Sequence, residues 1–178
     1  MFDSPSDSPS SDESFGVLFL CTGNSARSLL AEAALVRRGG DRFRSYSAGS
    51  KPTGTPHPRS LKTLERLGYD AALIASLRSK RWDEFAEPAA PRLDLVVTVC
   101  DNAAGETCPI WPGAPLTAHW GVEDPAAFEG PEDEALACFE RIHNELAAKI
   151  DGLVRLVGTA LPSDLSVLRD PIRALGDR

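Results

Sequence analysis

Long apolar runs and basic charge are both scarce in this sequence. No apolar run approaches the roughly 18 residues that a transmembrane helix needs, and no basic-then-apolar segment opens the chain. The 19 Lys and Arg residues against 26 Asp and Glu give a net charge of −7. An acidic surface disfavours non-specific binding to nucleic acid or to an anionic membrane. We therefore expect a cytoplasmic protein with small-molecule or protein ligands, and no nucleic-acid or membrane partner.

Histidine and cysteine are also few, with 3 His and 4 Cys in 178 residues. Four cysteines in an intracellular chain of this size favour catalysis or metal binding over a disulfide framework. Cys100 and Cys108 are far apart for a zinc pair, and the nearest histidine, His119, stands alone. A disulfide formed after the intervening segment rearranges and a structural pair both stay open. We expect no metal.

The length and composition predict one folded domain with two flanking segments. At 42% hydrophobic residues, the chain can bury a proper core. Residues 1–14 are mainly Ser, Asp and Pro, and we expect a disordered tail there. The domain is expected over residues 15–157. Residues 158–178 form a C-terminal extension whose spaced leucines favour a short docking helix or a contact with a partner.

Within the domain, apolar runs of strand type alternate with segments of helical periodicity. The predicted strands are 15–20, 43–48, 93–99 and 116–120, and the clearest predicted helices are 27–38, 58–67 and 131–156. Residues 101–111 have no periodicity and are expected to be a mobile loop. Strands that alternate with helices predict an α/β fold with a parallel sheet and right-handed crossovers.

The most informative stretch is VLFLCTGNSARS at residues 17–28, where a strand passes through a loop of small residues into a helix. In such a unit the loop N–H groups and the helix N-terminus point at one spot, which favours a tetrahedral oxyanion. The predicted substrate-binding residues are therefore Thr22, Gly23, Asn24, Ser25, Ala26, Arg27 and Ser28.

Cys21 lies at the floor of this predicted cradle. The positive potential there is expected to lower the pKa of its thiol and leave a nucleophilic thiolate. Arg27, six residues later, can bind two oxygens of the anion with its planar fork. Ser28 can donate a hydrogen bond to the thiolate or help the helix to begin. The alternative is a buried structural cysteine before an ordinary turn.

Three reactive side chains fall just past the carboxyl ends of predicted strands. These are Cys21, Cys100 and Asp124. Ligands of parallel α/β sheets bind at that edge, so we expect a catalytic site there. Asp124 precedes Pro125 and can protonate an oxygen that leaves the bound anion, or cap the next turn, or do both.

The combination of motifs resembles one known family. The segments are 17–33 (VLFLCTGNSARSLLAEA), 47–49 (SAG), 99–109 (VCDNAAGETCP), 119–121 (HWG) and 124–125 (DP). Over about residues 15–157 they resemble arsenate reductases of the low-molecular-weight protein tyrosine phosphatase superfamily, most of all the thioredoxin-coupled type. The resemblance implies a single three-layer α/β domain in which helices flank a four-stranded parallel sheet.

The resemblance also implies a cascade of thiolate attacks that detoxifies arsenate. Cys21 attacks arsenate held by the loop and Arg27, and Asp124 protonates the departing oxygen. Cys100 then attacks Cys21 and releases arsenite, and Cys108 attacks Cys100. An external thiol, either thioredoxin or glutathione with glutaredoxin, reduces the resulting disulfide. No tightly bound cofactor is implied, and phosphate or sulfate would compete with arsenate.

Two positions depart from the family pattern. Ala26 replaces a second cysteine that many relatives carry in the loop. Some relatives hold a potassium ion with residues that match Asn24, Glu32 and Ser47, but its other ligands are not recognisable around residues 76–83.

Two other functions compete with arsenate reduction. A phosphatase of the same fold would use Cys21, Arg27 and Asp124 alone, and would hydrolyse phosphotyrosine or small phosphoesters. Tyrosine phosphatases of this family usually place aromatic residues after Asp-Pro, whereas Ala126 and Ala127 follow here, which favours an inorganic oxyanion. A non-enzymatic redox or arsenic-sensing protein would need neither Arg27 nor Asp124.

Overall fold

The computed structural model describes residues 14–158 and 161–178. The tail expected at residues 1–14 therefore falls almost wholly outside the described residues. Within the described ranges, no helix combines the length and the apolar character needed to cross a membrane.

The centre of the molecule is one parallel sheet of four strands. These are β1 (Phe15–Cys21), β2 (Phe43–Gly49), β3 (Leu95–Thr98) and β4 (Leu116–His119), in the order β2-β1-β3-β4. The predicted four-stranded parallel sheet is confirmed. Every residue of β1 is buried, as expected for a central strand covered on both faces. Strand β3 is shorter than predicted and begins only after Asp94, whose carboxylate accepts the Gly16 N–H at 2.8 Å.

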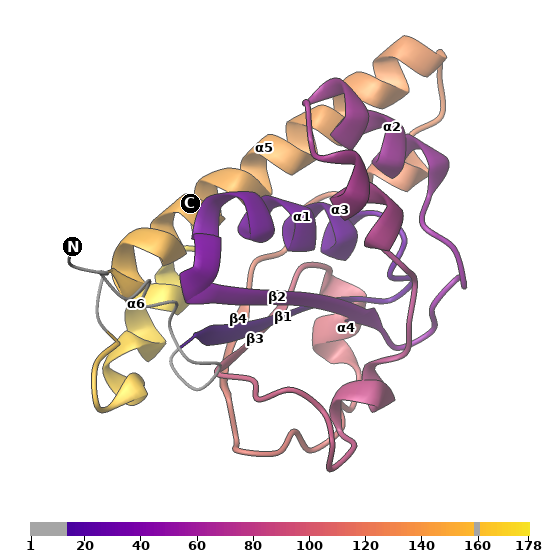
Figure 1. The fold of residues 1–178 in the computed structure, drawn as a ribbon. Coiled ribbons are helices and arrows are strands. Elements are labelled where there is room, and N and C mark those ends of the chain that lie inside the picture. Colours follow the sequence, from indigo (N-terminus) through magenta and orange to yellow (C-terminus); the bar gives the residue numbers. More distant parts are fainter. Residues whose placement is uncertain (1–13, 159–160) are drawn as a thin grey trace, which may run out of the picture.

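Helices cover one face of the sheet (Figure 1). Helix α1 (Arg27–Gly39) lies between the sheet and the long helix α5 (Glu132–Val157), and α2 (Pro58–Arg66) and α3 (Ala71–Ser76) lie beside them. The first hydrophobic core forms between these layers, and its fully buried members include Phe19, Leu30, Phe139 and Ile142. The short 3-10 helix η1 (Gly40–Arg42) joins α1 to β2.

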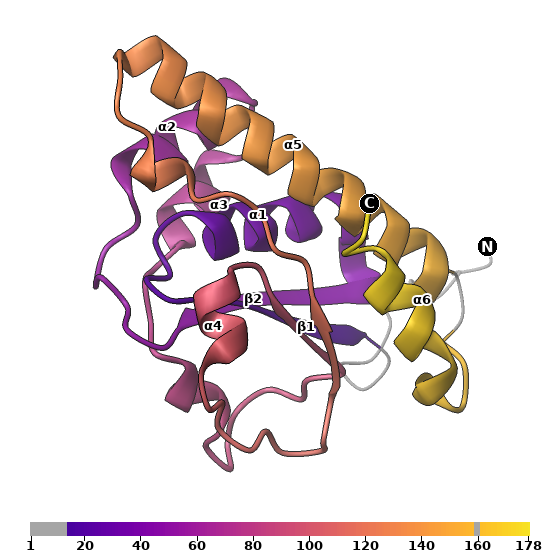
Figure 2. The ribbon, with the colours of Figure 1, turned by 180° about the vertical axis from the view of Figure 1, so that it is seen from behind.

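The other face carries a second, smaller core under short elements (Figure 2). The 3-10 helix η2 (Trp82–Phe85) and helix α4 (Asp101–Gly105) belong to this layer. Helix α4 corrects the expectation of a continuous mobile loop over residues 101–111. The Cys100 sulfur accepts the Ala103 N–H at 3.4 Å and caps the helix, a cap that residue patterns do not reveal.

The C-terminal segment docks on the first core. After the 3-10 helix η4 (Leu165–Leu168), helix α6 (Arg169–Ala174) contributes the buried Ile172. The indole N–H of Trp120 donates to the Ile172 carbonyl at 3.0 Å, and Lys149 Nζ donates to the Leu175 carbonyl at 3.1 Å. Of the two roles left open for this segment, the structure shows the docking helix.

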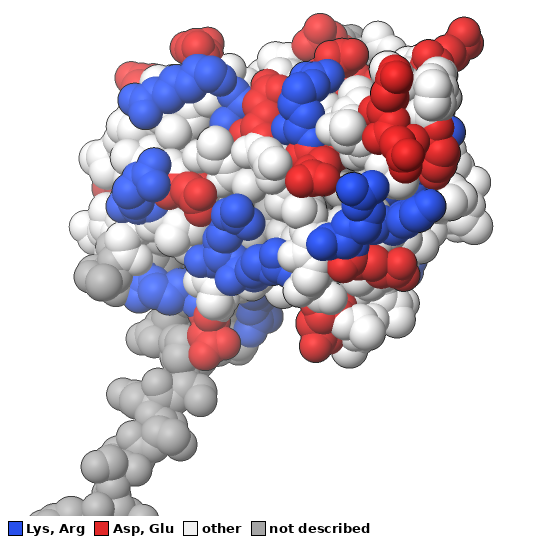
Figure 3. All heavy atoms as spheres, turned by 90° about the horizontal axis from the view of Figure 1, so that it is seen from above, with Lys and Arg blue, Asp and Glu red and all other residues white. Residues whose placement is uncertain are grey.

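Charges of both signs mix on the face drawn in Figure 3. Lys and Arg side chains alternate there with Asp and Glu side chains and do not gather into one basic patch.

We predict that the C-terminal segment contributes to global stability. Ile172→Ala should lower the free energy of unfolding by about 2–5 kcal/mol, because Ile172 is 1% exposed in the first core. Urea unfolding measures the effect. Val167→Ala in the same segment, where Val167 is 60% exposed, is the control with little expected change. Equal stability of the two variants would contradict a docked segment.

Candidate active site

Hydrogen bonds to its outward-facing carbonyl oxygens hold the loop between β1 and α1 in place. The carbonyls of Thr22, Gly23 and Ser25 each accept a backbone N–H at 2.9 Å, from Lys51, Thr53 and His57 respectively. A trans peptide points its N–H opposite its C=O. The amides that follow these carbonyls therefore turn toward the inside of the loop, where they can bind an oxyanion.

Cys21 ends β1 at the floor of this loop and is 3% exposed. Its sulfur accepts the Asn24 N–H at 3.2 Å and lies 2.9 Å from Ser28 Oγ. Burial raises the pKa of the Cys21 thiol, while the hydrogen bonds from Ser28 and Asn24 oppose that rise. The expected lowering of this pKa is therefore wrong, because loss of hydration outweighs the donors that surround the sulfur.

Asn24 holds the loop in shape with its side chain. Its φ is 44°, in the left-handed region that Asn tolerates better than most residues, and it is fully buried. Its Nδ2 donates to Ser28 Oγ at 2.8 Å and to Ser47 Oγ at 2.9 Å. Because Ser28 Oγ accepts from Asn24, the single Ser28 hydroxyl proton is available to donate to the Cys21 sulfur.

A buried ion pair lies beneath Asn24. Lys80 Nζ lies 3.7 Å from the Glu32 carboxylate and 3.5 Å from Ser47 Oγ, and Ser47 donates to Glu32. Burial raises the pKa of Glu32 and lowers the pKa of Lys80, and the charge of each partner opposes the other's shift. Within residues 76–83, Lys80 thus supplies an ammonium group that forms an ion pair with Glu32 and a hydrogen bond with Ser47. Within the described ranges, no cluster of three or more His, Cys, Asp or Glu side chains could hold a metal.

Arg27 and Asp124 meet at the mouth of the loop. Arg27 Nη2 lies 3.3 Å from Asp124 Oδ2, and Arg27 Nη1 donates to the Val122 carbonyl at 3.3 Å. Asp124 Oδ1 accepts the Ala126 N–H at 3.0 Å and caps the 3-10 turn η3 (Pro125–Ala127). Asp124 is therefore a cap whose second oxygen is paired with Arg27.

Cys100 adjoins the same loop from the next strand. Its sulfur lies 3.7 Å from Thr22 Oγ1, and the residue is 1% exposed. The structure thus brings Cys21, Cys100 and Asp124 to one edge of the sheet. All four cysteines lie in the described ranges and are free thiols. Cys138 lies on the buried side of α5, where it packs in the core.

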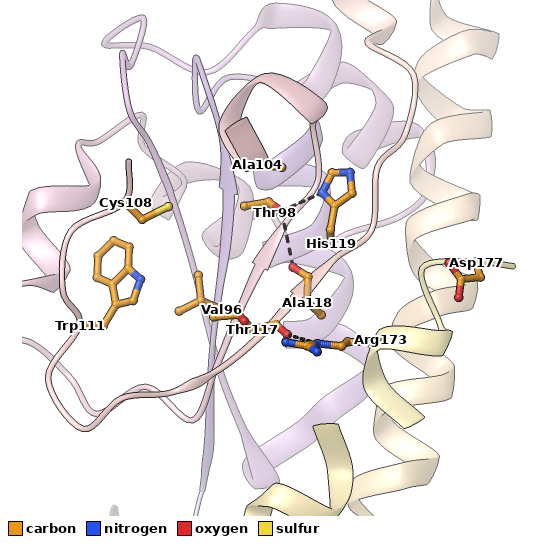
Figure 4. A pocket seen from close by; sticks show the side chains of 10 residues that line it. All are labelled: Val96, Thr98, Ala104, Cys108, Trp111, Thr117, Ala118, His119, Arg173 and Asp177. Carbon is orange, nitrogen blue, oxygen red and sulfur yellow. Dashed lines mark hydrogen bonds between the residues drawn. The ribbon is translucent and has the colours of Figure 1, made fainter. Parts of the chain in front are cut away.

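Cys108 is not brought to this group. It packs against the second core and lines a cavity of about 560 Å³. Figure 4 shows Cys108 beside Trp111, with His119 bonded to Thr98 on another side of the cavity. Burial and the charge of Glu106 raise the pKa of the Cys108 thiol. In this conformation Cys108 belongs to the face of the sheet opposite α1.

Comparison with known proteins places the chain in a family. The model of the low molecular weight phosphotyrosine protein phosphatase family matches residues 16–164. The chain belongs to this family. Among curated relatives of this phosphatase-family chain, the arsenate reductase of Halalkalibacterium halodurans is 37% identical over 134 residues, which are 75% of this chain and 91% of the relative. The arsenate reductase of Bacillus subtilis is 36% identical over the same shares.

Solved structures of the family share the fold. An arsenate reductase in the phosphate-binding state aligns with a TM-score of 0.63 at 23% identity, covering 81% of this chain and 99% of that one. The thioredoxin-dependent arsenate reductase of Corynebacterium glutamicum aligns with a TM-score of 0.53 at 28% identity, covering 77% of this chain and 62% of that one. A low molecular weight protein tyrosine phosphatase from T. tengcongensis aligns with a TM-score of 0.62 at 25% identity, covering 80% of this chain and 99% of that one.

The sequence did not single out Lys80 in this family member. The residue lies in a short irregular segment that also carries Arg78 and Arg81, where a lysine usually indicates solvent exposure. Its burial follows from tertiary contacts, since the Lys80 carbonyl accepts the Gly49 N–H at 2.9 Å. His57 Nδ1 accepts the Arg59 N–H at 3.1 Å and so caps the N-terminus of α2.

Removal of the Ser28 hydroxyl should raise the pKa of Cys21 further. A raised pKa leaves less thiolate at a given pH, so the alkylation rate of Cys21 in Ser28→Ala should begin to rise only at higher pH. The rate of alkylation of Cys21 by iodoacetamide as a function of pH measures the shift. Ser45→Ala is the control, because Ser45 Oγ donates to the Glu32 carbonyl away from Cys21. Superimposable profiles of the two variants would contradict the assigned Ser28 donor.

Proposed function

We propose that this protein reduces arsenate to arsenite through successive attacks by Cys21, Cys100 and Cys108. The family match and the relatives over most of the chain make it an arsenate reductase. The observation that favours the thiol cascade is the second buried thiol, Cys100, against the anion loop at Thr22. A hydrolytic phosphatase has no use for a thiol at that place.

In the first step the Cys21 thiolate attacks arsenic and an arsenate oxygen leaves. The bound arsenate dianion is itself a nearby base that can take the proton of a thiol with a raised pKa. The inward-facing loop amides and the Arg27 guanidinium bind the equatorial oxygens as negative charge builds on them. Asp124 supplies a proton to the departing oxygen, which leaves as water or hydroxide.

In the second step the Cys100 thiolate attacks the Cys21 sulfur. A disulfide forms between the two sulfurs and the sulfur–arsenic bond breaks, with its electron pair going to arsenic. Arsenic is thereby reduced to arsenite, and the two thiols are oxidised. The place of Cys100 supports this attack, because its sulfur lies 3.7 Å from Oγ1 of Thr22, the residue that follows Cys21 in the chain.

In the third step Cys108 attacks the Cys100 sulfur and Cys21 leaves as thiolate. This step needs the segment after α4 to move, because Cys108 packs against the second core. The second step itself loosens that segment. Cys100 caps α4 through the Ala103 N–H, and this cap is lost when Cys100 bonds to Cys21.

An external thiol then reduces the Cys100–Cys108 disulfide. We propose thioredoxin as this partner, because a solved relative from Corynebacterium glutamicum is thioredoxin-dependent. Glutathione with glutaredoxin is the alternative donor. A cascade that begins from free thiols requires a reducing compartment, which supports a place in the cytoplasm.

A phosphatase is the second candidate function. Cys21, Arg27 and Asp124 would serve it equally well, and the T. tengcongensis neighbour carries that name. The exposed Ala126 and Ala127 after Asp124-Pro125 offer no aromatic grip for a phosphotyrosine ring. We therefore propose arsenate as the substrate, with phosphate and sulfate as competing ligands.

Asp124→Asn should slow the first step by about 100-fold or more, because an amide cannot protonate the leaving oxygen. The later thiol exchanges should keep their rates. Rapid-quench measurement of Cys21 adduct formation and of disulfide formation separates the steps. An unchanged first step would make Asp124 only the cap of η3.

Cys108→Ser should still release one arsenite per chain and trap a Cys21–Cys100 disulfide, because the third thiol acts only afterwards. Non-reducing peptide mapping after one equivalent of arsenate identifies the linkage. In the wild type the same treatment should give the Cys100–Cys108 linkage.

Cys138→Ser is the matched control for this mapping, because Cys138 is a buried packing residue on α5. It should give the wild-type linkage. Four free thiols in the wild type after arsenate would contradict the cascade. Glutathionylated Cys21, found only with glutathione present, would contradict the roles of Cys100 and Cys108 and support direct reduction by the small thiol.

A further inference from the structure

We propose that Lys80 is a positioning residue for the nucleophile and acts as a built-in cation beneath the anion loop. Its ammonium group orders a chain of hydrogen bonds that presents the Ser28 hydroxyl to the Cys21 sulfur. The Lys80 side chain is 7% exposed and is paired with Glu32, whereas Arg27 is paired with Asp124. The inference rests on the proposed role of Cys21.

Lys80 holds Asn24 in two ways. Its backbone N–H donates to Asn24 Oδ1 at 2.8 Å, and its ammonium contacts Ser47 Oγ at 3.5 Å, to which Asn24 Nδ2 also donates. The segment that carries Lys80 is tied to the end of β2, since Gly49 forms a parallel bridge with Arg81. The backbone at Lys80 is therefore held in place by the sheet.

The directions of the hydrogen bonds follow from the charges at the lower end. Lys80 can only donate, and the Glu32 carboxylate can only accept. Ser47 gives its one proton to Glu32, so its oxygen can only accept from Asn24. The amide of Asn24 then has both Nδ2 protons engaged, on Ser47 and Ser28, and Ser28 directs its proton to Cys21.

The loss of Lys80 would disturb this order. A buried Glu32 without its counter-ion takes up a proton, because burial already raises its pKa and the charge of Lys80 opposes that rise. A protonated Glu32 is also a donor and competes with the Ser47 hydroxyl. Ser47 cannot turn its proton toward Asn24 Nδ2, which is itself a donor. Asn24 and Ser28 then lose their fixed orientation.

The test is Lys80→Met, which keeps an unbranched side chain that reaches as far as the carbon bearing the ammonium and removes the ammonium group itself. The kcat for arsenate should fall about 100-fold with a much smaller change in KM, because the nucleophile is misplaced while Arg27 still binds the anion. Arg81→Met is the matched control. Arg81 is an exposed cation next in the chain, paired with Asp83 at 2.9 Å, and its removal should leave kcat unchanged.

Alkylation of Cys21 by iodoacetamide tests the same inference without arsenate. In Lys80→Met the rate should begin to rise only at higher pH, because Cys21 loses the Ser28 hydrogen bond that lowers its pKa. A folded Lys80→Met variant with the wild-type alkylation profile would overturn the proposal. If wild-type protein failed to reduce arsenate, the proposed function would fail, and this profile would still decide the role of Lys80.

A small cation should restore the variant. The space left by the ammonium is lined by the Glu32 carboxylate, the Ser47 hydroxyl and the Arg78 carbonyl, which accepts from Lys80 Nζ at 3.0 Å. These oxygens suit a monovalent cation such as ammonium or potassium. Either chloride salt should raise the kcat of Lys80→Met, and tetramethylammonium chloride at equal ionic strength should not. Equal effects of all three salts would contradict a positioned cation.

Ser47→Ala is the second variant, used if Lys80→Met does not fold. It breaks the chain between Lys80 and Asn24 and leaves the ion pair with Glu32 in place. Its Cys21 alkylation profile should shift to higher pH in the same direction. An unshifted profile in folded Ser47→Ala would overturn the proposed chain.

Discussion

The site depends on the hydrogen bonds that the carbonyls of the loop between β1 and α1 accept from outside the loop. The carbonyls of residues 22, 23 and 25 each accept a backbone N–H from residues 51–57, so the amides that follow them turn toward the inside of the loop, where the Asn24 N–H donates to the Cys21 sulfur. The parallel sheet places the other functional groups at the same edge, because β3 runs parallel beside β1 and β4 runs parallel beside β3. The Cys100 thiol and the Asp124 carboxylate reach the loop from those two strands.

A buried nucleophile creates an electrostatic conflict that the rest of the loop answers. Burial excludes water from Cys21 and raises its pKa, while the Ser28 and Asn24 donors lower it. In the proposed mechanism, a tetrahedral dianion that enters the loop meets inward N–H groups and Arg27 and removes the thiol proton. That mechanism makes substrate binding and activation of the nucleophile one event.

The parts of this site that the sequence predicts are local or follow from topology. The loop after β1 is a contiguous motif, and the common edge of Cys21 and Asp124 follows from parallel strands. Helix α4 was missed because its cap is the Cys100 sulfur. The direction of the Cys21 pKa shift was predicted wrongly because the effect of burial outweighs that of the hydrogen-bond donors around the sulfur. Lys80 reaches Glu32 only through tertiary contacts of an irregular segment, which periodicity cannot predict.

The central claim is that the thiols of the chain itself supply the electrons that reduce arsenate. It is tested most directly by a single turnover of fully reduced protein with excess arsenate and no external reductant. The account predicts one arsenite released and two thiols lost per wild-type chain, and no arsenite from Cys21→Ser. Arsenite release by Cys21→Ser, or none by the wild type with its thiols intact, would contradict it.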